Sequence, residues 1–121
     1  MKLSIIIPVY NEVKTLEEVI NKVKKLKLDK EIVVVDDGSE DGSRELLKKI
    51  ENIKLILHEK NYGKGKAVRT GLDNIEGDVV VIQDADLEYD PTDFVKMFDE
   101  IKNGEKVVYG SRFLEKFDKV I

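Results

Sequence analysis

The sequence has 121 residues, with 21 Lys and Arg against 25 Asp and Glu, and a formal net charge of −4. This balance excludes sequence-independent binding of nucleic acid through a broad basic surface. The absence of cysteine excludes disulfides and thiolate metal sites, and no apolar run approaches the length that crosses a bilayer. With 41% hydrophobic residues, the chain is expected to form a single domain over residues 1–121.

The first half of the sequence alternates between strand and helix patterns. Residues 3–9 are apolar and rich in β-branched side chains, which predicts a buried strand. Apolar residues then recur at helical spacing from Val13 to Val23 and predict an amphipathic helix that ends near Leu28. A second strand is predicted at 31–35, followed by a short helix with Leu47 on its apolar face.

The second half continues this alternation. Strands are predicted at 53–57, 79–82 and 107–109, with helices at 67–75 and, opened by Asp90-Pro91, at 90–101. Strands that alternate with helices predict an α/β fold. We therefore expect a Rossmann-like, mostly parallel sheet with helices on both faces, in the strand order 3-2-1-4 plus a fifth strand.

The most informative polar pair follows the fourth predicted strand. The apolar run from Val79 to Ile82 ends in Asp84 and Asp86, which emerge together at the carboxyl end of that strand. Two carboxylates one residue apart can share a hard divalent cation, and a cation with open positions can hold a nucleotide diphosphate. Aspartate is also common where a strand enters a loop, so the pair taken alone favours the interpretation as solvated turn residues.

Further polar clusters follow the first, second and fifth predicted strands. They are Tyr10-Asn11-Glu12, Asp36-Asp37-Gly38-Ser39 and Gly110-Ser111-Arg112. Each cluster also has a purely structural explanation: Asn11 fits a helix cap, Gly38-Ser39 fits a turn and a cap, and Gly63 and Gly65 fit a loop before a helix. Ligands of parallel sheets bind beyond the carboxyl ends of the strands, so the convergence of these clusters favours one ligand with a base, a ribose and a diphosphate.

Five motifs follow one another along the chain. They are Ser4–Glu12, Val35–Gly42, Asn61–Ala67, Asp84–Glu88 and Val108–Phe113. In this order they resemble the motifs of family 2 glycosyltransferases of the GT-A fold, over nearly the whole chain. The motifs at Asn61–Ala67 and at Gly110–Phe113 resemble most the polyprenyl-phosphate (dolichyl-phosphate) mannosyl- and glucosyltransferases.

The resemblance implies a binding site for the nucleoside. Pro8, Tyr10 and Glu12 would contact the nucleoside, and Asp37, together with Asp36, would hydrogen-bond the base or the ribose. The chemistry agrees with these roles, because a carboxylate accepts hydrogen bonds from base N–H groups and ribose hydroxyls, and an aromatic ring supplies a flat apolar wall.

The resemblance also implies a metal site. Asp84 and Asp86 match the DxD motif of the family, with Asp86 as a ligand of Mg²⁺ or Mn²⁺, Asp84 as a ligand of ribose or metal, and Glu88 as a further metal ligand. Arg112 offers a guanidinium fork that matches a phosphate. Asp86 and Arg112 are therefore the predicted catalytic residues.

The segment before the third predicted helix completes the expected site. Lys64 and Lys66, or the backbone N–H groups of Gly63 and Gly65, would support the diphosphate at the helix start. His58 follows a strand expected at the edge of the sheet, matches no role in the family, and is interpreted as a surface residue.

The activity implied by the resemblance is inverting transfer of a hexose from a GDP- or UDP-linked sugar to a polyprenyl or dolichyl phosphate. The alternative is a nucleotide-sugar-binding module or fragment without transfer activity. A sugar nucleotidyltransferase is disfavoured, because those enzymes usually carry a Gly-rich loop with Arg and Lys where this chain has Tyr10-Asn11-Glu12.

Members of the family usually continue past the motif that ends at Phe113. The chain is therefore expected to be the donor-binding part of a longer protein, truncated on its C-terminal side. We expect a cytoplasmic location, at the cytoplasmic face of a membrane for the full-length protein, and no nucleic-acid partner. Apolar surface around residues 107–109 would favour self-association.

Overall fold

The computed structural model describes residues 2–86 and 113–115 and centres on one sheet with the strand order β3-β2-β1-β4-β5. The elements in chain order are β1 Leu3–Val9, α1 Leu16–Lys24, β2 Lys30–Asp36, α2 Ser43–Lys48, β3 Lys54–Leu57, α3 Lys64–Leu72, β4 Val79–Ile82 and β5 Phe113–Glu115. Strands β1 to β4 run parallel, and β5 runs antiparallel to β4. The predicted order 3-2-1-4 of the parallel strands is confirmed.

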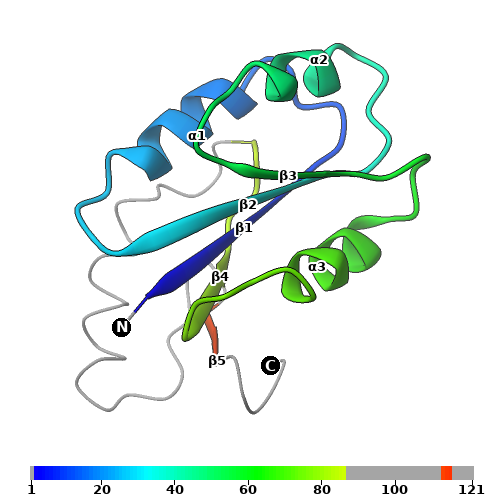
Figure 1. The fold of residues 1–121 in the computed structure, drawn as a ribbon. Helices are drawn as coiled ribbons and strands as arrows, with labels where there is room; N and C mark the ends of the chain where they lie inside the picture. The colour runs from blue at the N-terminus through cyan, green and yellow to red at the C-terminus, as the bar shows by residue number, and fades with distance from the viewer. Residues whose placement is uncertain (1, 87–112, 116–121) are drawn as a thin grey trace.

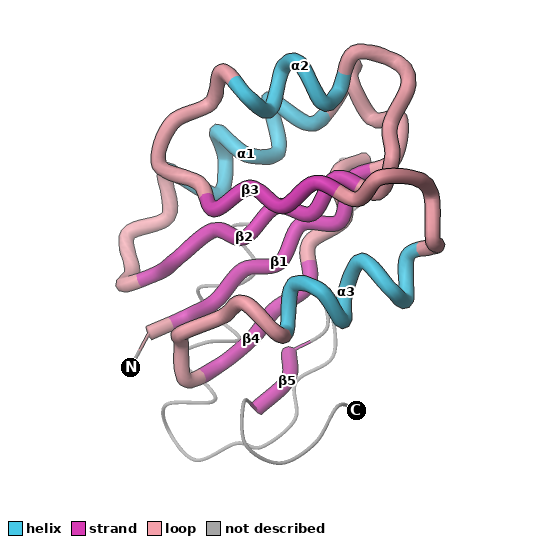
Figure 2. The backbone as a smooth tube through the Cα atoms, turned by 45° about the vertical axis from the view of Figure 1, so that its right-hand side comes forward, coloured by secondary structure: helices cyan, strands magenta, loops and turns pink. Residues whose placement is uncertain are grey.

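Helices cover both faces of this sheet, as the alternating sequence pattern predicted. Figures 1 and 2 show α1 and α2 over one face and α3 over the other. This arrangement follows from the strands, which are apolar on both sides: Ile5 and Ile7 pack in the cluster that contains α1, whereas Ile6 packs with Leu72 of α3. A strand buried on both faces has no polar alternation, and β1 shows none.

Several element boundaries differ from the sequence-based prediction. Helix α3 spans Lys64–Leu72, where a helix at 67–75 was predicted. Helix α1 ends at Lys24 rather than near Leu28, because the N–H of Leu26 bonds the carbonyl of Val23 and closes the last turn tightly. Strand β5 at Phe113–Glu115 was not predicted, because a three-residue strand is too short to show a period. The predicted helix at 90–101 and the predicted strand at 107–109 lie outside the described residues.

The amino ends of the strands are joined by the partly buried carboxylate of Glu31. Glu31 accepts hydrogen bonds from the hydroxyl of Ser4 (2.6 Å) and from the N–H of Gly77 (3.0 Å). Burial opposes the ionisation of Glu31, but these bonds, with another from the N–H of Glu76 and the positive charge of Lys54, outweigh it and lower the pKa of Glu31. Its contacts tie the start of β4 to β1 and β2 and give this carboxylate a structural role.

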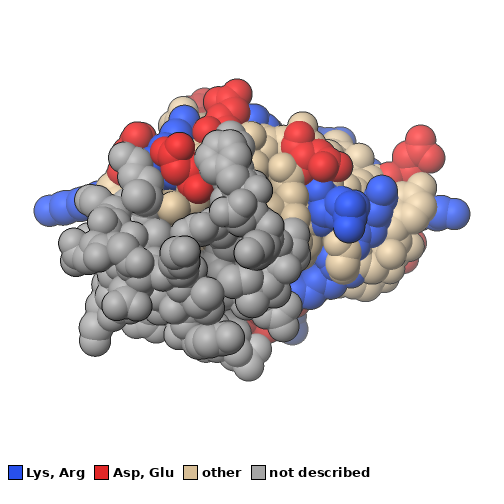
Figure 3. Space-filling view, turned by 90° about the horizontal axis from the view of Figure 1, so that it is seen from below, with Lys and Arg blue, Asp and Glu red and all other residues tan. Residues whose placement is uncertain are grey.

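The described part of one face of the molecule carries side chains of both signs. Figure 3 shows acidic and basic side chains close to one another there. Among the residues that the structure describes, no helix combines the length and the apolar character needed to cross a membrane.

Candidate functional site

A cavity of about 510 Å³ lies at the edge of the sheet where the parallel strands end. Its lining residues come from the segments after β1, β2 and β4 and from the start of α3: Pro8, Val9, Tyr10, Glu12, Asp37, Asn61, Gly63, Lys64, Ala67, Asp84, Ala85 and Asp86. The fold therefore brings together most of the site residues expected from the sequence. Asp36 and Lys66 are not part of this lining, and Glu88 and Arg112 lie outside the described residues.

The loop that carries Tyr10 and Glu12 is held by the loop after β2. The N–H of Asn11 donates to the hydroxyl of Ser39 (2.9 Å), and the side-chain oxygen of Asn11 accepts from the N–H of Glu40 (2.8 Å). Asn11 adopts a left-handed conformation with φ of 53°, and α1 begins only at Leu16. The structural explanation of Asn11 as a helix cap is therefore wrong. Asn11 ties two loops of the cavity edge to each other.

Asp41 and Ser43 make the second set of contacts between these loops. The N–H of Glu12 donates to the hydroxyl of Ser43 (3.1 Å), and the N–H of Val13 donates to Asp41 (3.1 Å). Burial opposes the ionisation of Asp41, but hydrogen bonds from Ser43 and Val13 outweigh it and lower the pKa of Asp41. The polar residues after β2 thus hold the backbone of Glu12 and Val13 in place.

Asp36 is fully buried and faces its own partners rather than the cavity. It accepts a charge-assisted hydrogen bond from Nε of Arg44 at 2.8 Å and a longer one from the N–H of Ser39 at 3.3 Å. A second guanidinium nitrogen of Arg44 donates to the carbonyl of His58. The structure therefore gives Asp36 a position that joins the ends of β2, α2 and β3, and its predicted contact with a nucleotide remains a prediction.

Asp37 lines the cavity with a carboxylate that is already hydrogen-bonded on both oxygens. Its Oδ1 lies 2.8 Å from Nδ1 of His58 and accepts from the N–H of Tyr62 at 3.0 Å, while Oδ2 accepts from the N–H of Gly63 at 2.9 Å. Burial opposes ionisation, but the bonds from His58, Tyr62 and Gly63 outweigh it and hold the pKa of Asp37 below its ordinary value.

These contacts correct one expectation from the sequence. The His58 side chain is only 10% exposed, so its interpretation as a surface residue is wrong. The N–H of Gly63 donates to Asp37, and its predicted contact with a diphosphate remains a prediction. The N–H groups of Lys64, Gly65 and Lys66 remain at the start of α3, where a helix leaves them without intrahelical partners.

The loop after β4 is fixed from two sides. The N–H of Gln83 donates to the carbonyl of Ile6 (2.9 Å), and its side-chain amide donates to the carbonyl of Asp84 (2.9 Å). The hydroxyl of Thr15 donates to the carbonyl of Ala85. These bonds hold the backbone of residues 83–85 against β1 and the start of α1, so the two aspartates reach the cavity from a firmly placed loop.

Negative charge concentrates at this end of the cavity. Burial and the nearby charge of Asp86, with smaller contributions from Asp41 and Asp84, raise the pKa of Glu12 above its ordinary value. Lys64 forms an ion pair with Asp84 and partly offsets this charge. Carboxylates that repel one another in this way are suited to share a hard cation, for which oxygen is the preferred ligand.

The described residues alone do not complete a metal site. Within residues 2–86 and 113–115, no three side chains of His, Cys, Asp or Glu converge closely enough to enclose an ion. Asp84 and Asp86 supply two carboxylates beside an open cavity, which fits a cation that takes its remaining ligands from a bound molecule.

His58 is the main site residue that sequence reasoning missed. The register of the sheet contains the signal that could have found it: Asp36 of β2 pairs with Leu57 of β3, so the next residues along these strands, Asp37 and His58, emerge side by side. This inference needs the exact register, which the apolar pattern of a short strand does not define.

Comparison with known proteins gives a consistent result. The family model "Glycosyl transferase family 2" matches residues 4–120. The chain is 39% identical over 120 residues to a dolichol-phosphate mannosyltransferase of Pyrococcus furiosus, a match that covers 95% of this chain and 34% of that protein. The chain thus spans about a third of the length of this curated relative.

Solved structures of similar proteins share the architecture. The crystal structure of S. aureus TarS 1-349 in complex with UDP has a TM-score of 0.75 and 31% identity, covering 85% of this chain and 32% of that chain. A mannosyltransferase from Pyrobaculum calidifontis in complex with GDP-Man and Mn²⁺ has a TM-score of 0.69 and 28% identity, covering 87% of this chain and 33% of that chain.

Proposed function

This chain belongs to glycosyl transferase family 2, and from that premise we propose that it binds a nucleotide sugar for inverting transfer of a hexose. The observation that carries the proposal is the cavity itself, where Asp37 and the pair Asp84 and Asp86 meet from the ends of two parallel strands, β2 and β4, of a GT-A sheet. The matched structures with UDP and with GDP-Man support a diphosphate nucleoside as the common ligand.

The nucleoside end of the ligand would lie against the loop after β1. Tyr10 is 45% exposed and lines the cavity, so its ring offers a flat wall to a base or a ribose. Pro8 and Glu12 extend this wall, and the remaining acceptor capacity of Asp37 suits a base N–H or a ribose hydroxyl.

The diphosphate end would lie between β4 and the start of α3. Asp84 and Asp86 would hold Mg²⁺ or Mn²⁺, with Glu88 as a further ligand. A bound divalent cation would supply positive charge to the departing diphosphate. Lys64 lines the cavity beside Asp84, and the first N–H groups of α3 favour negative charge at the same place. Arg112 and Lys66 would add further cationic groups for phosphate.

The acceptor we propose is a polyprenyl phosphate such as dolichyl phosphate. The proposal rests on the similarity to a dolichol-phosphate mannosyltransferase. A phosphate monoester is already an anionic nucleophile and needs little help from a general base. The reaction would then take place at the cytoplasmic face of a membrane, where such a lipid presents its phosphate.

A nucleotide-sugar-binding module without transfer activity is the second candidate. The specific observation in its favour is that the described cavity is lined by residues whose predicted roles are to bind the nucleotide or its metal, while the match covers only 34% of the curated relative. Binding and transfer must therefore be measured separately.

The experiment is isothermal titration calorimetry with UDP, GDP, UDP-glucose and GDP-mannose, each with Mn²⁺ and with EDTA. We expect binding of UDP and UDP-glucose, of GDP and GDP-mannose, or of all four. Mn²⁺ should strengthen that binding by at least about tenfold. Absence of binding by all four compounds at millimolar concentration would contradict the proposal. Transfer is then assayed with radiolabelled nucleotide sugar and detergent-solubilised polyprenyl phosphate.

A further inference from the structure

Asp37 has most of its capacity to accept hydrogen bonds occupied by the protein itself. A carboxylate offers about four lone-pair positions. Oδ1 receives hydrogen bonds from His58 and Tyr62, and Oδ2 receives one from Gly63. The position that remains for a ligand is therefore on Oδ2, and the other three contacts fix the orientation of the group.

The imidazole of His58 is itself held on both ring nitrogens. An ionised carboxylate only accepts hydrogen bonds, so Nδ1 of His58 carries the proton that points to Asp37. Nε2 lies 2.8 Å from the hydroxyl of Thr70 on α3, and a hydroxyl can either donate or accept there. The ring thus connects the end of β3 to the end of β2 and to α3.

The backbone of His58 is fixed as well. Its N–H donates to the carbonyl of Asp36 at 2.9 Å, and its carbonyl accepts from Arg44. The ring of Tyr62 meets the imidazole edge-on, with 5.4 Å between the ring centroids. Asp37 and Arg44 are thus two charged residues that hydrogen-bond His58, one at its ring and one at its carbonyl.

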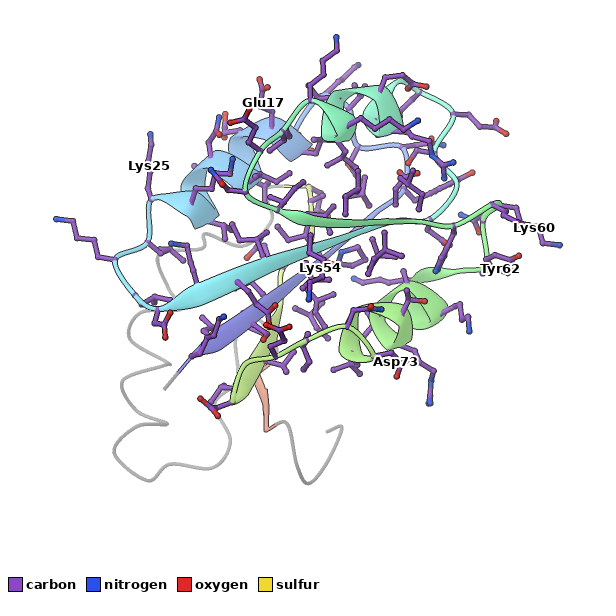
Figure 4. All side chains as sticks on the ribbon, in the orientation of Figure 1. Glu17, Lys25, Lys54, Lys60, Tyr62 and Asp73 are labelled. Atoms are coloured by element: carbon purple, nitrogen blue, oxygen red, sulfur yellow. The ribbon has the colours of Figure 1, made fainter. Side chains whose placement is uncertain are left out.

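The segment after His58 lies directly against the loop after β2. A Cβ atom added to Gly38 would come within 2.5 Å of the backbone of Lys60 and within 2.6 Å of the backbone of Asn61. Figure 4 shows Lys60 and Tyr62 in this loop between β3 and α3. The next residues, Gly63 and Lys64, line the cavity, so the position of this segment sets the shape of one cavity wall.

We propose that His58 is a positioning residue for recognition of the nucleoside, acting through Asp37 and through the segment 61–63. This inference rests on the proposed function. His58 does not line the cavity and would not touch the nucleotide. It keeps Asp37 in the one orientation that leaves an acceptor position on Oδ2, and the nucleotide does not have to order that carboxylate when it binds.

The test compares His58→Ala with the more conservative His58→Asn, whose amide can still donate a hydrogen bond near the Nδ1 position. Thr70→Val removes the hydroxyl beside Nε2 and keeps the shape of the side chain, and Thr70→Ser is its matched control. Calorimetry with UMP, GMP, UDP and GDP is run well below the unfolding temperature of each variant. Amide hydrogen exchange of Tyr62 and Gly63 is measured in the same proteins.

For His58→Ala we expect roughly tenfold weaker binding, by the same factor for the monophosphate and the diphosphate of the preferred base. His58→Asn should recover part of this loss, and exchange at Tyr62 and Gly63 should be faster in His58→Ala. In an Asp37→Asn background the His58→Ala change should have little further effect on binding, because the two residues act as a unit.

Three results overturn the inference, and they are distinguishable. If the parent binds nucleotide and both His58→Ala and Thr70→Val bind it equally well, His58 has only a structural role and the proposed function stands. If the parent itself binds none of the four nucleotides, the proposed function fails and the inference fails with it. A loss limited to the diphosphates would also overturn it, because it would place His58 at the wrong end of the ligand.

Discussion

Asp36 and Asp37 are adjacent in the sequence, yet the structure gives their carboxylates different partners. Successive side chains of a strand point to opposite faces of the sheet, so neighbouring aspartates at a strand end diverge. Asp36 is fully buried against Arg44, while Asp37 faces His58 and the cavity. A sequence motif that contains two aspartates therefore supplies one structural ion pair and one candidate ligand-binding group.

Asp86 is the residue on which the metal proposal depends most. Asp86→Ala removes one of the two cavity-lining carboxylates of the predicted metal site, so we expect at least a tenfold loss of affinity for UDP or GDP in the presence of Mn²⁺. The affinity for the nucleoside monophosphate should fall much less, because the monophosphate carries less charge near the metal. Calorimetry measures both affinities. Asp73→Ala is the control, since Asp73 is an exposed aspartate at the end of α3. Equal diphosphate affinity in the Asp86 variant and the parent would contradict the metal assignment.

Asp37 should make the stability of the fold sensitive to acid. Its pKa is lowered in the folded protein, because the hydrogen bonds from His58, Tyr62 and Gly63 outweigh the effect of burial. The unfolded chain therefore binds the proton at higher pH than the folded chain does. This stabilisation is present above about pH 4 and is lost as the pH falls towards the folded pKa.

The measurement is urea unfolding of the parent and of Asp37→Asn between pH 7 and pH 2. The free energy of unfolding of the parent should fall more steeply below about pH 4 than that of the variant, which has no carboxylate to protonate at this position. If the free energies of unfolding of the two proteins changed in parallel with pH, the ionised carboxylate of Asp37 would not stabilise the fold. Asp73→Asn serves as the exposed control and should follow the parent.

At the scale of the elements, α3 lies unusually close to the sheet at Gly71. A Cβ atom at this position would lie 2.6 Å from Cγ2 of Ile6, a fully buried side chain of β1. The helix therefore needs glycine here for packing, although glycine weakens a helix. This close approach sets the distance between α3 and β1, and with it the depth of the cavity at Ala67 on the same helix face.

Two glycine substitutions in α3 should therefore act in opposite directions. Gly71→Ala gains about 1 kcal/mol of helix propensity, but overpacking against Ile6 costs about 1–3 kcal/mol, so we expect net destabilisation. Gly65→Ala is the matched variant, because a Cβ there meets no atom within 4 Å and should leave stability unchanged or raised. Thermal unfolding of both variants checks this. If Gly71→Ala were more stable than the parent, β1 and α3 could move apart to fit the added methyl group without any loss of stability.

At the scale of the whole molecule, the strand order decides which residues can meet. Because β1 lies between β2 and β4, the three segments that follow these strands share one edge of the sheet. The amino end of the antiparallel β5 reaches the same edge, since Phe113 pairs with Val81 near the end of β4. Polar groups that are far apart in the sequence converge there, while the opposite edge is closed by the structural contacts of Glu31.

The sequence by itself determined the architecture and most of the cavity lining. Long apolar strands that alternate with amphipathic helices admit few folds other than a mostly parallel sheet with the ligand beyond its carboxyl edge, because each apolar face must be covered. The positions of Tyr10, Asp37 and Asp86 at that edge followed from this rule. Neither the short strand at 113–115 nor the early end of α1 could be predicted, because runs this short carry no readable period.

Only the tertiary structure decided what the individual polar groups do. The contact between His58 and Asp37, the ion pair of Asp36 with Arg44, and the role of Asn11 in joining two loops all depend on strand register and loop position to within an ångström. Hydrogen bonds act only over such distances, whereas burial of apolar surface tolerates larger displacements. For this reason the apolar pattern predicted where the site lies, and the folded chain determined which side chains are free to bind a ligand and which hold the others in place.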